Sequence, residues 1–289
     1  MIIVVDSGSY KSDWMFTPAG GQALTFRTAG INPFFTPEKE IVRIIQHFKA
    51  IKPYIEEATE IYFFGSGCTS PDRREMVSNA VSAVFKNAFV SVDTDLIGST
   101  YATCGDRPGI ICTMGTGSNI SFFDGETVQP SKHGTGFILG DLGSGAWFGK
   151  KLLTDYLYGL LPPELSDDFG ARHDVTRENV IRHVYQEAHP NTYLASFAPF
   201  MSEHAEHPYI SSLLYNGFEE FVKTNIFSYP DFQEHICHFV GSIAYFYSQP
   251  LYAVCENNGI KVGKIIRQPI QDLYDYVVER ESKERNIII

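Results

Sequence analysis

Two short segments of the chain share one pattern, in which an apolar strand is followed by a turn of glycine and hydroxyl residues and then by a second strand. They lie at residues 2–17 and 110–123, and aligning Gly8 with Gly117 brings them into register. Repetition of a supersecondary unit indicates a duplicated domain, because similar sequences fold in similar ways. The chain is therefore expected to contain two related halves.

The first hundred residues alternate between strand and helix patterns. Short apolar runs predict strands at residues 2–6, 14–17, 23–27, 61–64 and 89–92. Apolar residues at helical spacing predict helices at residues 38–51, 70–86 and near 98–104. The resulting order, β-β-β-α-β-α, is typical of an α/β domain.

A similar series of elements begins at Gly109. The patterns predict strands at residues 110–113 and 120–123, a third strand before His133, a helix at 144–159, a helix at 238–257 and a strand at 263–266. Residues 162–228 are mostly polar with short apolar stripes, which indicates a helical insertion, and the charged run 279–285 indicates a solvated helix end. We expect an α/β fold with domains at residues 1–106 and 107–289, the second holding the insertion at about 150–235.

Composition narrows the classes of function. The 289 residues are 44% hydrophobic and carry a formal net charge of -11, which argues against binding nucleic acid through a broad basic surface. The apolar run at residues 2–5 has the length of a buried strand, and no run of about 18 apolar residues predicts a membrane span. Five scattered cysteines without a CxxC pair indicate neither a disulfide framework nor a structural zinc site, so we expect a reducing cytoplasm.

The first candidate site is the turn Asp6–Lys11, which follows a predicted buried strand. A carboxylate such as that of Asp6 is costly to bury without a partner, and a hydrated Mg²⁺ is a suitable one. Gly8 and Ser9 could hold a phosphate, since backbone N–H groups and hydroxyls can face it without an obstructing side chain, and Lys11 could add positive charge. The alternative is an ordinary hairpin with a surface lysine.

Two further glycine-rich turns are candidate ligand loops. Gly115–Asn119 combines two glycines, two hydroxyl residues and an amide directly after a predicted strand, although an ordinary hairpin is the alternative. Gly134–Gly145 holds five glycines and one aspartate before a predicted helix. It could bind a ligand, or Ser144 could simply cap the helix that follows.

A fourth candidate is Asp93-Thr94-Asp95, directly after the predicted strand at residues 89–92. A carboxylate at the C-terminal end of a strand, beside a cleft, suits a general base that accepts a proton from a substrate hydroxyl during phosphoryl transfer. Helix capping by Asp93 or Asp95 is the alternative interpretation.

Together, and in this order along nearly the whole chain, these segments resemble the BadF/BadG/BcrA/BcrD-type ATPase family, which includes the N-acetylglucosamine kinases and has the acetate-kinase/sugar-kinase/Hsp70/actin fold. The resemblance rests on segments similar to the first phosphate loop (Asp6–Lys11, followed by Trp14), the sugar-contacting Asn segment (Gly30–Pro33), a small sugar turn (Gly65–Gly67), the catalytic D-x-x-G-S segment (Asp95–Ser99), the second phosphate loop GTGSN (Gly115–Asn119), the GGWGxxxGDEGS segment (Gly134–Ser144), a helix start near adenosine (Phe239–Ala244) and a closing strand (Gly263–Ile266).

The resemblance implies two ribonuclease-H-like domains in an actin-like ATPase architecture, with ATP and a sugar in the cleft that separates them. It implies that Asp95 is the catalytic base, acting on the 6-hydroxyl of N-acetylglucosamine, and that Asp6 holds Mg²⁺ through water. The implied ATP-binding residues are Gly8, Ser9, Tyr10, Lys11, Thr116, Gly117, Ser118, Gly241 and Ser242. The implied sugar-binding residues are Asn32, Gly67, Asp95, Gly117, Gly136 and Asp141. The family often dimerises, so a homodimer is a further expectation.

The sequence departs from the family pattern at three positions. Tyr10 stands where the first phosphate loop usually has threonine, which replaces a small hydroxyl by a bulky ring. Thr135 replaces a tryptophan and Leu142 replaces the glutamate of GDEGS, both in the segment that resembles a sugar site.

Three other interpretations stay open. Activator ATPases of this family hold an iron–sulfur cluster through cysteines in Gly-Cys-Gly turns, a context that Cys104 and Cys112 lack. A non-enzymatic sugar or nucleotide sensor is compatible with Tyr10. His204 and His207 could share one helix face in a metal site, although a solvated polar turn is the simpler interpretation.

Overall fold

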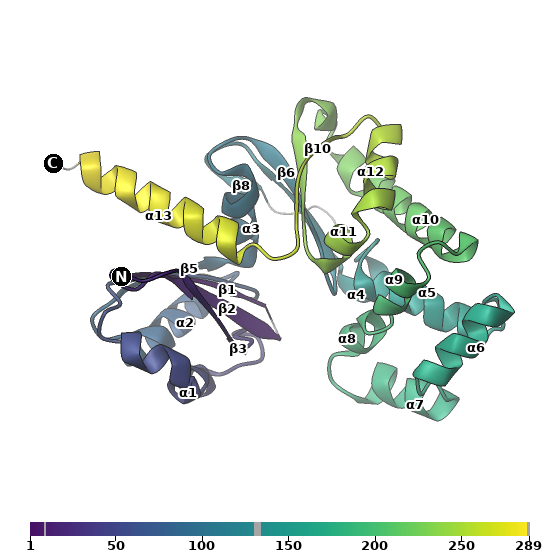
Figure 1. Cartoon of the computed structure of the whole chain (residues 1–289), viewed down its shortest axis with the longest axis horizontal. Coiled ribbons are helices and arrows are strands. Elements are labelled where there is room, and N and C mark those ends of the chain that lie inside the picture. Colours follow the sequence, from purple (N-terminus) through teal and green to yellow (C-terminus); the bar gives the residue numbers. More distant parts are fainter. Residues whose placement is uncertain (9, 130–133, 288–289) are drawn as a thin grey trace. The chain divides into compact units, whose positions relative to one another are not determined.

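The computed structural model describes residues 1–8, 10–129 and 134–287, and the chain divides into two compact units. Unit 1 consists of Met1–Asp106 and Pro269–Ile289, and unit 2 of Arg107–Gln268 (Figure 1). Each unit holds a five-stranded sheet with its own helices.

Unit 1 is built on a mixed sheet with the strand order β3-β2-β1-β4-β5. Strands β1, β2 and β3 are antiparallel neighbours, whereas β4 runs parallel to β1 and β5 parallel to β4. The elements of unit 1 are β1 (Ile2–Ser7), β2 (Lys11–Phe16), β3 (Leu24–Ala29), α1 (Glu38–His47), the 3-10 helix η1 (Lys49–Tyr54), β4 (Glu60–Gly65), α2 (Pro71–Val84), β5 (Phe89–Thr94), α3 (Asp95–Cys104) and α13 (Ile270–Ile287).

The apolar run of β1 is continuous because the strand is buried on both faces. Ile3 and Val5 pack into a core with Ile41 of α1 and Val77 of α2. Val4 is equally buried and points to the opposite face, since successive side chains of a strand alternate. Helix α13 packs against α3 and against strands β1 and β2. The central strand of unit 1 is therefore enclosed, as its sequence predicted.

The division of the chain differs from the expected one in its last helix. We expected residues 107–289 to form one domain, whereas Pro269–Ile289 group with unit 1. Leu273 and Val277 of α13 are completely buried, and Tyr274 Oη donates a hydrogen bond to Thr17 Oγ1, 2.9 Å away. These contacts attach the last helix to the first sheet. The charged run at its end is helical, and Lys283 to Arg285 are exposed as expected.

Unit 2 repeats the topology of unit 1, with the strand order β10-β9-β6-β7-β8. Strands β6, β7 and β8 are antiparallel neighbours, and β9 and β10 follow in parallel. The elements of unit 2 are β6 (Gly109–Met114), β7 (Ser118–Phe123), β8 (Val128–Gln129), α4 (Gly136–Leu139), α5 (Gly145–Leu157), α6 (Pro163–Arg172), α7 (Arg177–Ile181), the π-helix η2 (Arg182–Gln186), α8 (Pro190–Ala195), α9 (Pro199–Glu203), α10 (Pro208–Thr224), the 3-10 helices η3 (Ile226–Ser228) and η4 (Phe232–Glu234), β9 (Ile236–Val240), α11 (Ser242–Phe246), α12 (Ser248–Asn257) and β10 (Lys261–Ile266).

The two sheets confirm the predicted duplication. In each unit a three-stranded antiparallel meander leads to two parallel strands, so β1 corresponds to β6 and the β1–β2 turn to the β6–β7 turn. The fold is the expected α/β pair of ribonuclease-H-like domains, and helices α6 to α10 form the insertion in the second. The insertion packs on α5 through phenylalanine rings: Phe218 of α10 meets Phe148 of α5 edge to face, with centroids 5.4 Å apart.

One predicted helix is wrong in its first part. Residues 238–257 were expected to form a single helix, but 236–240 form strand β9 and only the later residues form α11 and α12. A short apolar run that is buried on both faces cannot be distinguished from a buried helix by periodicity. Gly241 separates the two structures at φ 128°, a conformation that a residue with a side chain rarely adopts.

Further differences from the predicted elements concern a helix end and a loop. The helix expected at residues 38–51 ends at His47 and is followed by η1, which contains Pro53. The loop expected at Gly134–Gly145 contains the one-turn helix α4. The first change concerns the end of an element, where local signals are weakest.

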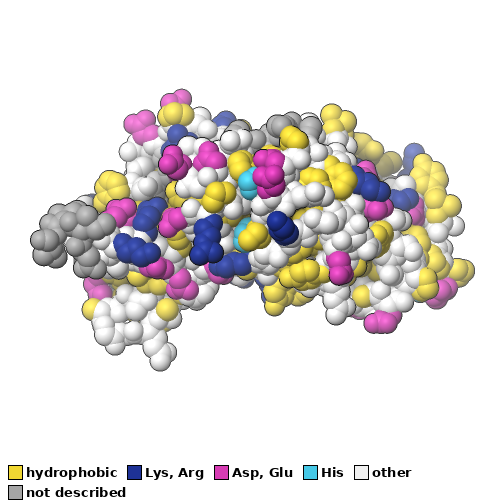
Figure 2. Space-filling view, turned by 90° about the horizontal axis from the view of Figure 1, so that it is seen from above, with side chains coloured by type: hydrophobic (Ala, Val, Ile, Leu, Met, Phe, Trp, Pro, Cys, Tyr) yellow, Lys and Arg dark blue, Asp and Glu magenta, His cyan; other side chains and the backbone are white. Residues whose placement is uncertain are grey.

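The helices and the surface charges bear on membrane and nucleic-acid binding. No helix among residues 1–8, 10–129 and 134–287 is both long and apolar enough to cross a bilayer. Acidic and basic side chains are interspersed over the face that Figure 2 displays.

Candidate active site

The first group of candidate residues lies at the β1–β2 turn in unit 1. Asp6 ends the apolar part of β1 and pairs across the ladder with Asp13 of β2. The Gly8 N–H donates to the Lys11 carbonyl oxygen at 2.9 Å, which closes the turn. Tyr10 lies in this turn with 50% of its surface exposed, so its ring is not part of the core. The predicted phosphate residue Ser9 lies outside the described residues.

Asp13 is a residue of this site that the sequence did not suggest. It is almost completely buried and forms ion pairs with Lys11, at 2.8 Å, and with Arg27, at 2.7 Å. Lys11 was predicted to add charge beside a phosphate, and in this structure it neutralises Asp13. Asp13 lies between two positive side chains on neighbouring strands, but its strand pattern alone gave no sign of that role.

Asp95 is the first residue of α3, directly after β5. The helix cap is Thr94, whose Oγ1 accepts from the Ile97 N–H at 3.3 Å, and Asp93 accepts from the Thr94 N–H at 2.9 Å. The capping interpretation of Asp95 is therefore wrong. Its carboxylate instead accepts a hydrogen bond from the Ser66 hydroxyl. Ser66 belongs to the predicted sugar turn, but its role as a partner of Asp95 was not expected.

The carboxyl groups of Asp6 and Asp95 both have raised pKa values. Burial, together with the negative charges of Asp95 and Asp13, raises the pKa of Asp6 to about 7, and the positive charge of Lys11 opposes this rise. Burial also raises the pKa of Asp95, while hydrogen bonds from Ser66 and from the Leu96 N–H lower it. A cation beside Asp6 would favour the ionised carboxylate, and oxygen donors of this kind suit Mg²⁺. The residues present therefore fit the predicted metal.

The structure brings two predicted sugar-binding residues together in unit 1. Gly67 has φ 83°, and a β-carbon there would collide with Asn32 Oδ1. The buried Ser7 fixes the backbone next to Asn32. Its Oγ donates to the Ile31 carbonyl at 2.9 Å and accepts from the Ile31 N–H at 3.1 Å. Asn32 and Gly67 are thus neighbours, and the adjacent Ser66 links them to Asp95.

A second group of candidate residues lies at the β6–β7 turn in unit 2. The Gly115 N–H donates to the Gly117 carbonyl at 2.9 Å. Helix α5 begins against this turn, because the Gly145 N–H donates to the Gly115 carbonyl at 2.8 Å and the Ala146 N–H to the Thr116 carbonyl at 3.0 Å. Ser144 accepts from the Trp147 N–H at 3.2 Å. Ser144 therefore caps α5, which was the alternative interpretation of this residue.

Asp141 lies directly against this second turn. A β-carbon on Gly117 would be 2.7 Å from Asp141 Oδ2, so only glycine fits there without a shift. Burial raises the pKa of Asp141, which the Ser118 N–H and Lys150 partly offset. The structure thus brings the predicted sugar residues Gly117 and Asp141 together. Gly136 begins α4 at φ 74° with open space around it.

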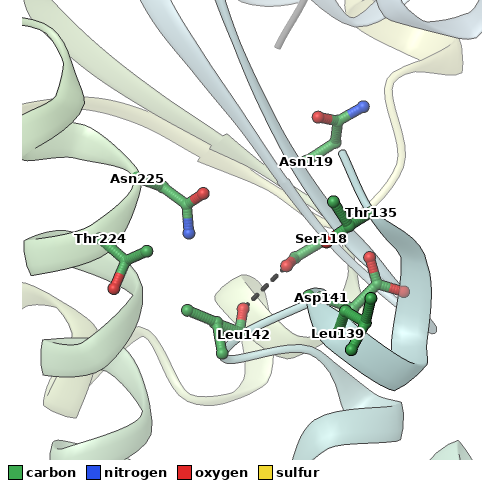
Figure 3. Close-up of a pocket in the computed structure, with 9 residues that line it drawn as sticks. Ser118, Asn119, Thr135, Leu139, Asp141, Leu142, Thr224 and Asn225 are labelled. Atoms are coloured by element: carbon green, nitrogen blue, oxygen red, sulfur yellow. Dashed lines mark hydrogen bonds between the residues drawn. The ribbon is translucent and has the colours of Figure 1, made fainter. Parts of the chain in front are cut away.

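A cavity of about 250 Å³ lies beside Asp141. Ser118 and Asp141 form one side, and the Ser118 hydroxyl donates to the Leu142 carbonyl at 2.7 Å (Figure 3). Thr224 and Asn225, at the end of α10, face them from the opposite side. These two residues were missed because nothing in the α10 pattern distinguishes the end that lines a cavity.

A second cavity of about 410 Å³ lies on the other side of the β6–β7 turn. Its lining includes Thr116 and Ser242, which were both predicted to contact ATP. Gly241 allows the backbone before Ser242 to lie close to the end of β6, since a β-carbon on Gly241 would collide with the Met114 carbonyl. Residues of α8 and α9 complete the wall, and they lie in the insertion, where no binding residue was expected.

The remaining candidates have structural partners. His204 pairs with Asp168 at 2.8 Å and His207 with Glu164 at 2.9 Å, so both histidines contact α6. Over the described ranges, no group of three or more His, Cys, Asp or Glu side chains could hold a metal ion. Cys104 and Cys112 are buried, and neither forms a disulfide.

Comparison with solved structures places the chain among sugar kinases. A protein from Porphyromonas gingivalis, provisionally named an N-acetylglucosamine kinase, is 34% identical with a TM-score of 0.89, and the match covers 96% of this chain and 98% of that one. A Chromobacterium violaceum protein with the same provisional name is 18% identical with a TM-score of 0.61, over 95% of this chain and 98% of that one. A ROK family glucokinase from Streptomyces griseus, solved with glucose and AMPPNP, is 14% identical with a TM-score of 0.60 and the same coverage.

These similarities differ in what they establish. The last two relatives share the fold alone, because their sequence identity is low. No family model matches the chain, and no curated protein matches its sequence. The first relative is similar in sequence and in structure over nearly the full length of both chains. The chain therefore belongs to the N-acetylglucosamine kinase-like family of BadF-type sugar kinases, phosphotransferases with an alcohol group as acceptor, in the actin-like ATPase fold.

Proposed function

We propose that this sugar kinase uses ATP and Mg²⁺ to phosphorylate N-acetylglucosamine at its 6-hydroxyl. Two relatives carry N-acetylglucosamine kinase as a provisional name, and one of them is 34% identical to this chain. A third, more distant relative was solved with glucose and an ATP analogue. The observation that carries the proposal is the grouping in unit 1 of Asp95, Ser66, Gly67 and Asn32, a general base beside a predicted sugar turn.

In this proposal the glycine turns contact the phosphates of ATP. Gly8, Ser9, Tyr10 and Lys11 do so from unit 1, and Thr116, Gly117 and Ser118 from unit 2, while Gly241 and Ser242 border the nucleoside. Glycine has no β-carbon, so backbone N–H groups at the glycines of these turns can approach phosphate oxygens. Mg²⁺, held by Asp6 through water, would neutralise charge on the phosphates. Phosphoryl transfer needs alignment and charge neutralisation more than covalent help, which suits this arrangement.

Asp95 accepts the proton of the sugar hydroxyl as its oxygen attacks phosphorus. Burial, which raises the pKa of Asp95, also makes its carboxylate a stronger base. The hydrogen bond from Ser66 fixes the direction of the carboxylate. Asn32 and Gly67 hold the sugar from unit 1, and Gly117, Gly136 and Asp141 hold it from unit 2.

The central test is the Asp95→Asn variant. We expect it to bind sugar nearly as tightly as wild type and to lose at least about 100-fold in kcat, which is typical for removal of a general base. Asp93→Asn is the matched control, because Asp93 is two residues away and its carboxylate accepts from its own turn. Near-normal turnover in Asp95→Asn, or an equal loss in both variants, would overturn the assignment of Asp95.

A screen of acceptors tests the substrate. ADP release is measured with N-acetylglucosamine, N-acetylmannosamine, glucosamine, glucose and buffer alone. The proposal expects the highest kcat/KM with N-acetylglucosamine. Tight binding of a sugar with no ADP release would instead indicate a sensor.

Cytoplasmic location and a homodimer belong to the same proposal. The five cysteines are buried and form no disulfide, which suits a reducing compartment. Light scattering on the purified protein measures the oligomeric state directly.

A further inference from the structure

The cavity of about 410 Å³ beside Gly115 and Thr116 is suited to a flat aromatic ring. Ala195 and Ala198 line one side of it, and Ile243 and Phe246 line another. The Phe246 ring is 54% exposed, and the Arg267 guanidinium lies 4.8 Å from its centroid. Apolar walls with a few fixed polar groups are the usual environment of a nucleotide base.

The polar groups in the wall form a chain with a fixed direction. Tyr247 is 4% exposed, and its Oη lies 2.7 Å from the Ala198 carbonyl oxygen. A carbonyl only accepts, so the single Tyr247 proton is donated to it. Ser202 Oγ lies 2.8 Å from the same Tyr247 Oη, although the two residues are 45 positions apart. Because Tyr247 has no second proton, Ser202 must donate to Tyr247.

This direction determines what Ser202 offers to the cavity. The Ser202 proton is committed to Tyr247, so only the lone pairs of Ser202 Oγ remain for a ligand. Glu203, the neighbouring polar side chain of the lining, is ion-paired with Arg172 and is also an acceptor. This edge of the cavity therefore presents acceptors and needs a donor from its ligand.

We propose that Ser202, oriented by Tyr247, makes the kinase selective for a purine nucleotide with an amino group at position 6 over one with an oxygen there. A 6-amino group donates to Ser202, whereas a 6-oxo group would place two acceptors against each other and leave both without a hydrogen bond. The inference deepens the proposed function and rests on it, since it assumes that the turn beside the cavity holds the phosphates.

The test is binding of ADP and IDP, measured by calorimetry in the absence of sugar. These nucleotides have the same sugar and phosphates and differ only in the base. ADP has an amino group at position 6, whereas IDP has an oxygen there and a proton on N1. Wild type should bind ADP about 10-fold more tightly, the value of one neutral hydrogen bond. Ser202→Ala should bring the two affinities within about 2-fold, mainly by weakening ADP.

Two further variants test the direction of the hydrogen bonds. Ser202→Thr keeps the hydroxyl and should keep most of the preference for ADP. Tyr247→Phe releases the Ser202 proton, which can then be donated to a 6-oxo group, so IDP should bind more tightly than it does to wild type. Tyr247 is buried, and if Tyr247→Phe lowers the melting temperature, the test uses the Ser202 variants only. Ser202 is exposed, so its substitution should not disturb folding.

The outcomes separate this inference from the proposed function. Equal binding of ADP and IDP by wild type, binding of neither, or an unchanged preference in Ser202→Ala would each overturn the role of Ser202. A preference for ADP that depends on Ser202 supports that role even if no sugar is phosphorylated, which would overturn the proposed function instead.

Discussion

The carboxyl group of Asp6 has a pKa of about 7 in the folded chain, compared with 3.8 for an ordinary aspartate. Burial is the main cause, since it removes the water that stabilises the charge, and the charges of Asp95 and Asp13 add repulsion. The folded protein without metal therefore holds a proton that the unfolded chain releases. Burial of the ionised Asp6 carboxylate therefore lowers the stability of the folded protein, as is common for perturbed groups at functional sites.

The first prediction concerns Asp6→Asn in the metal-free protein. The unfolded carboxyl ionises near 3.8 and the folded one near 7, so wild type loses stability as the pH rises between these values. The variant has no such carboxyl. Its free energy of unfolding should equal that of wild type at about pH 4 and exceed it by up to about 4 kcal/mol above about pH 8. Urea denaturation at several pH values measures the difference.

Asp124→Asn serves as a control with the opposite sign. The Thr127 and Glu126 N–H groups donate to Asp124 and lower its pKa. Asp124 therefore contributes stability at neutral pH that is lost as the pH falls through its pKa, and Asp124→Asn should be destabilised only above that range. A gain in Asp6→Asn that is the same at every pH would contradict our account of Asp6.

At the scale of elements, helix α5 determines the position of the second turn. Its first N–H groups donate to the Gly115 and Thr116 carbonyls, and Lys150 of the same helix acts on Asp141. The helix is itself located by α8, whose backbone approaches so closely that a β-carbon on Gly149 would collide with the Leu194 carbonyl. A residue without a side chain is thus required where the two helices meet.

The second prediction is that Gly149→Ala destabilises the protein. Alanine in a helix is normally better than glycine by about 1 kcal/mol, but here the methyl group meets a backbone that cannot turn aside. We expect a net loss of about 1–3 kcal/mol, as for other overpacked sites, measured by thermal and urea denaturation.

Gly21→Ala is the matched control for Gly149→Ala. A β-carbon on Gly21 would make only ordinary contacts with Pro18, at 3.5 Å or more. This variant should be within about 0.5 kcal/mol of wild type. If Gly149→Ala were as stable as Gly21→Ala, α5 and α8 would not be in the close contact that the structure shows.

At the scale of the whole molecule, the chain leaves unit 1 at Asp106 and returns to it at Pro269. Unit 2 is a continuous insertion, whereas unit 1 is completed only by the last helix. Leu273 of α13 is completely buried and lies against α3, where a β-carbon on Gly98 would be 3.3 Å from its Cδ2. The first sheet therefore depends on a helix that follows unit 2 along the chain.

The third prediction compares Leu273→Ala with Leu251→Ala. Both leucines are completely buried, the first in α13 of unit 1 and the second in α12 of unit 2. Each truncation should cost about 2–5 kcal/mol of unfolding free energy. Hydrogen exchange followed by mass spectrometry should show faster exchange at residues 2–104 for Leu273→Ala and at residues 109–266 for Leu251→Ala. Loss of protection in unit 2 alone on changing Leu273 would contradict the division of the chain.

The sequence predicted most of the two sheets and both glycine turns. Gly8 and Gly117 were recognisable because each follows a short apolar strand, and strand and turn signals lie in adjacent residues. The helix at 238–257 was misjudged in its first residues because a strand buried on both faces has no alternation to reveal it.

By itself, the sequence determined where strands end in glycine-rich turns, that the unit is duplicated, and that an aspartate follows the fifth strand. Each of these depends on neighbouring residues. Only the tertiary structure decided that Ser66 orients Asp95, that Asp13 neutralises Lys11, that Ser202 and Tyr247 meet in the wall of a cavity, and that α13 completes unit 1. These pairs are formed by packing of segments distant in the chain, and local propensity carries no information about which distant side chains will meet.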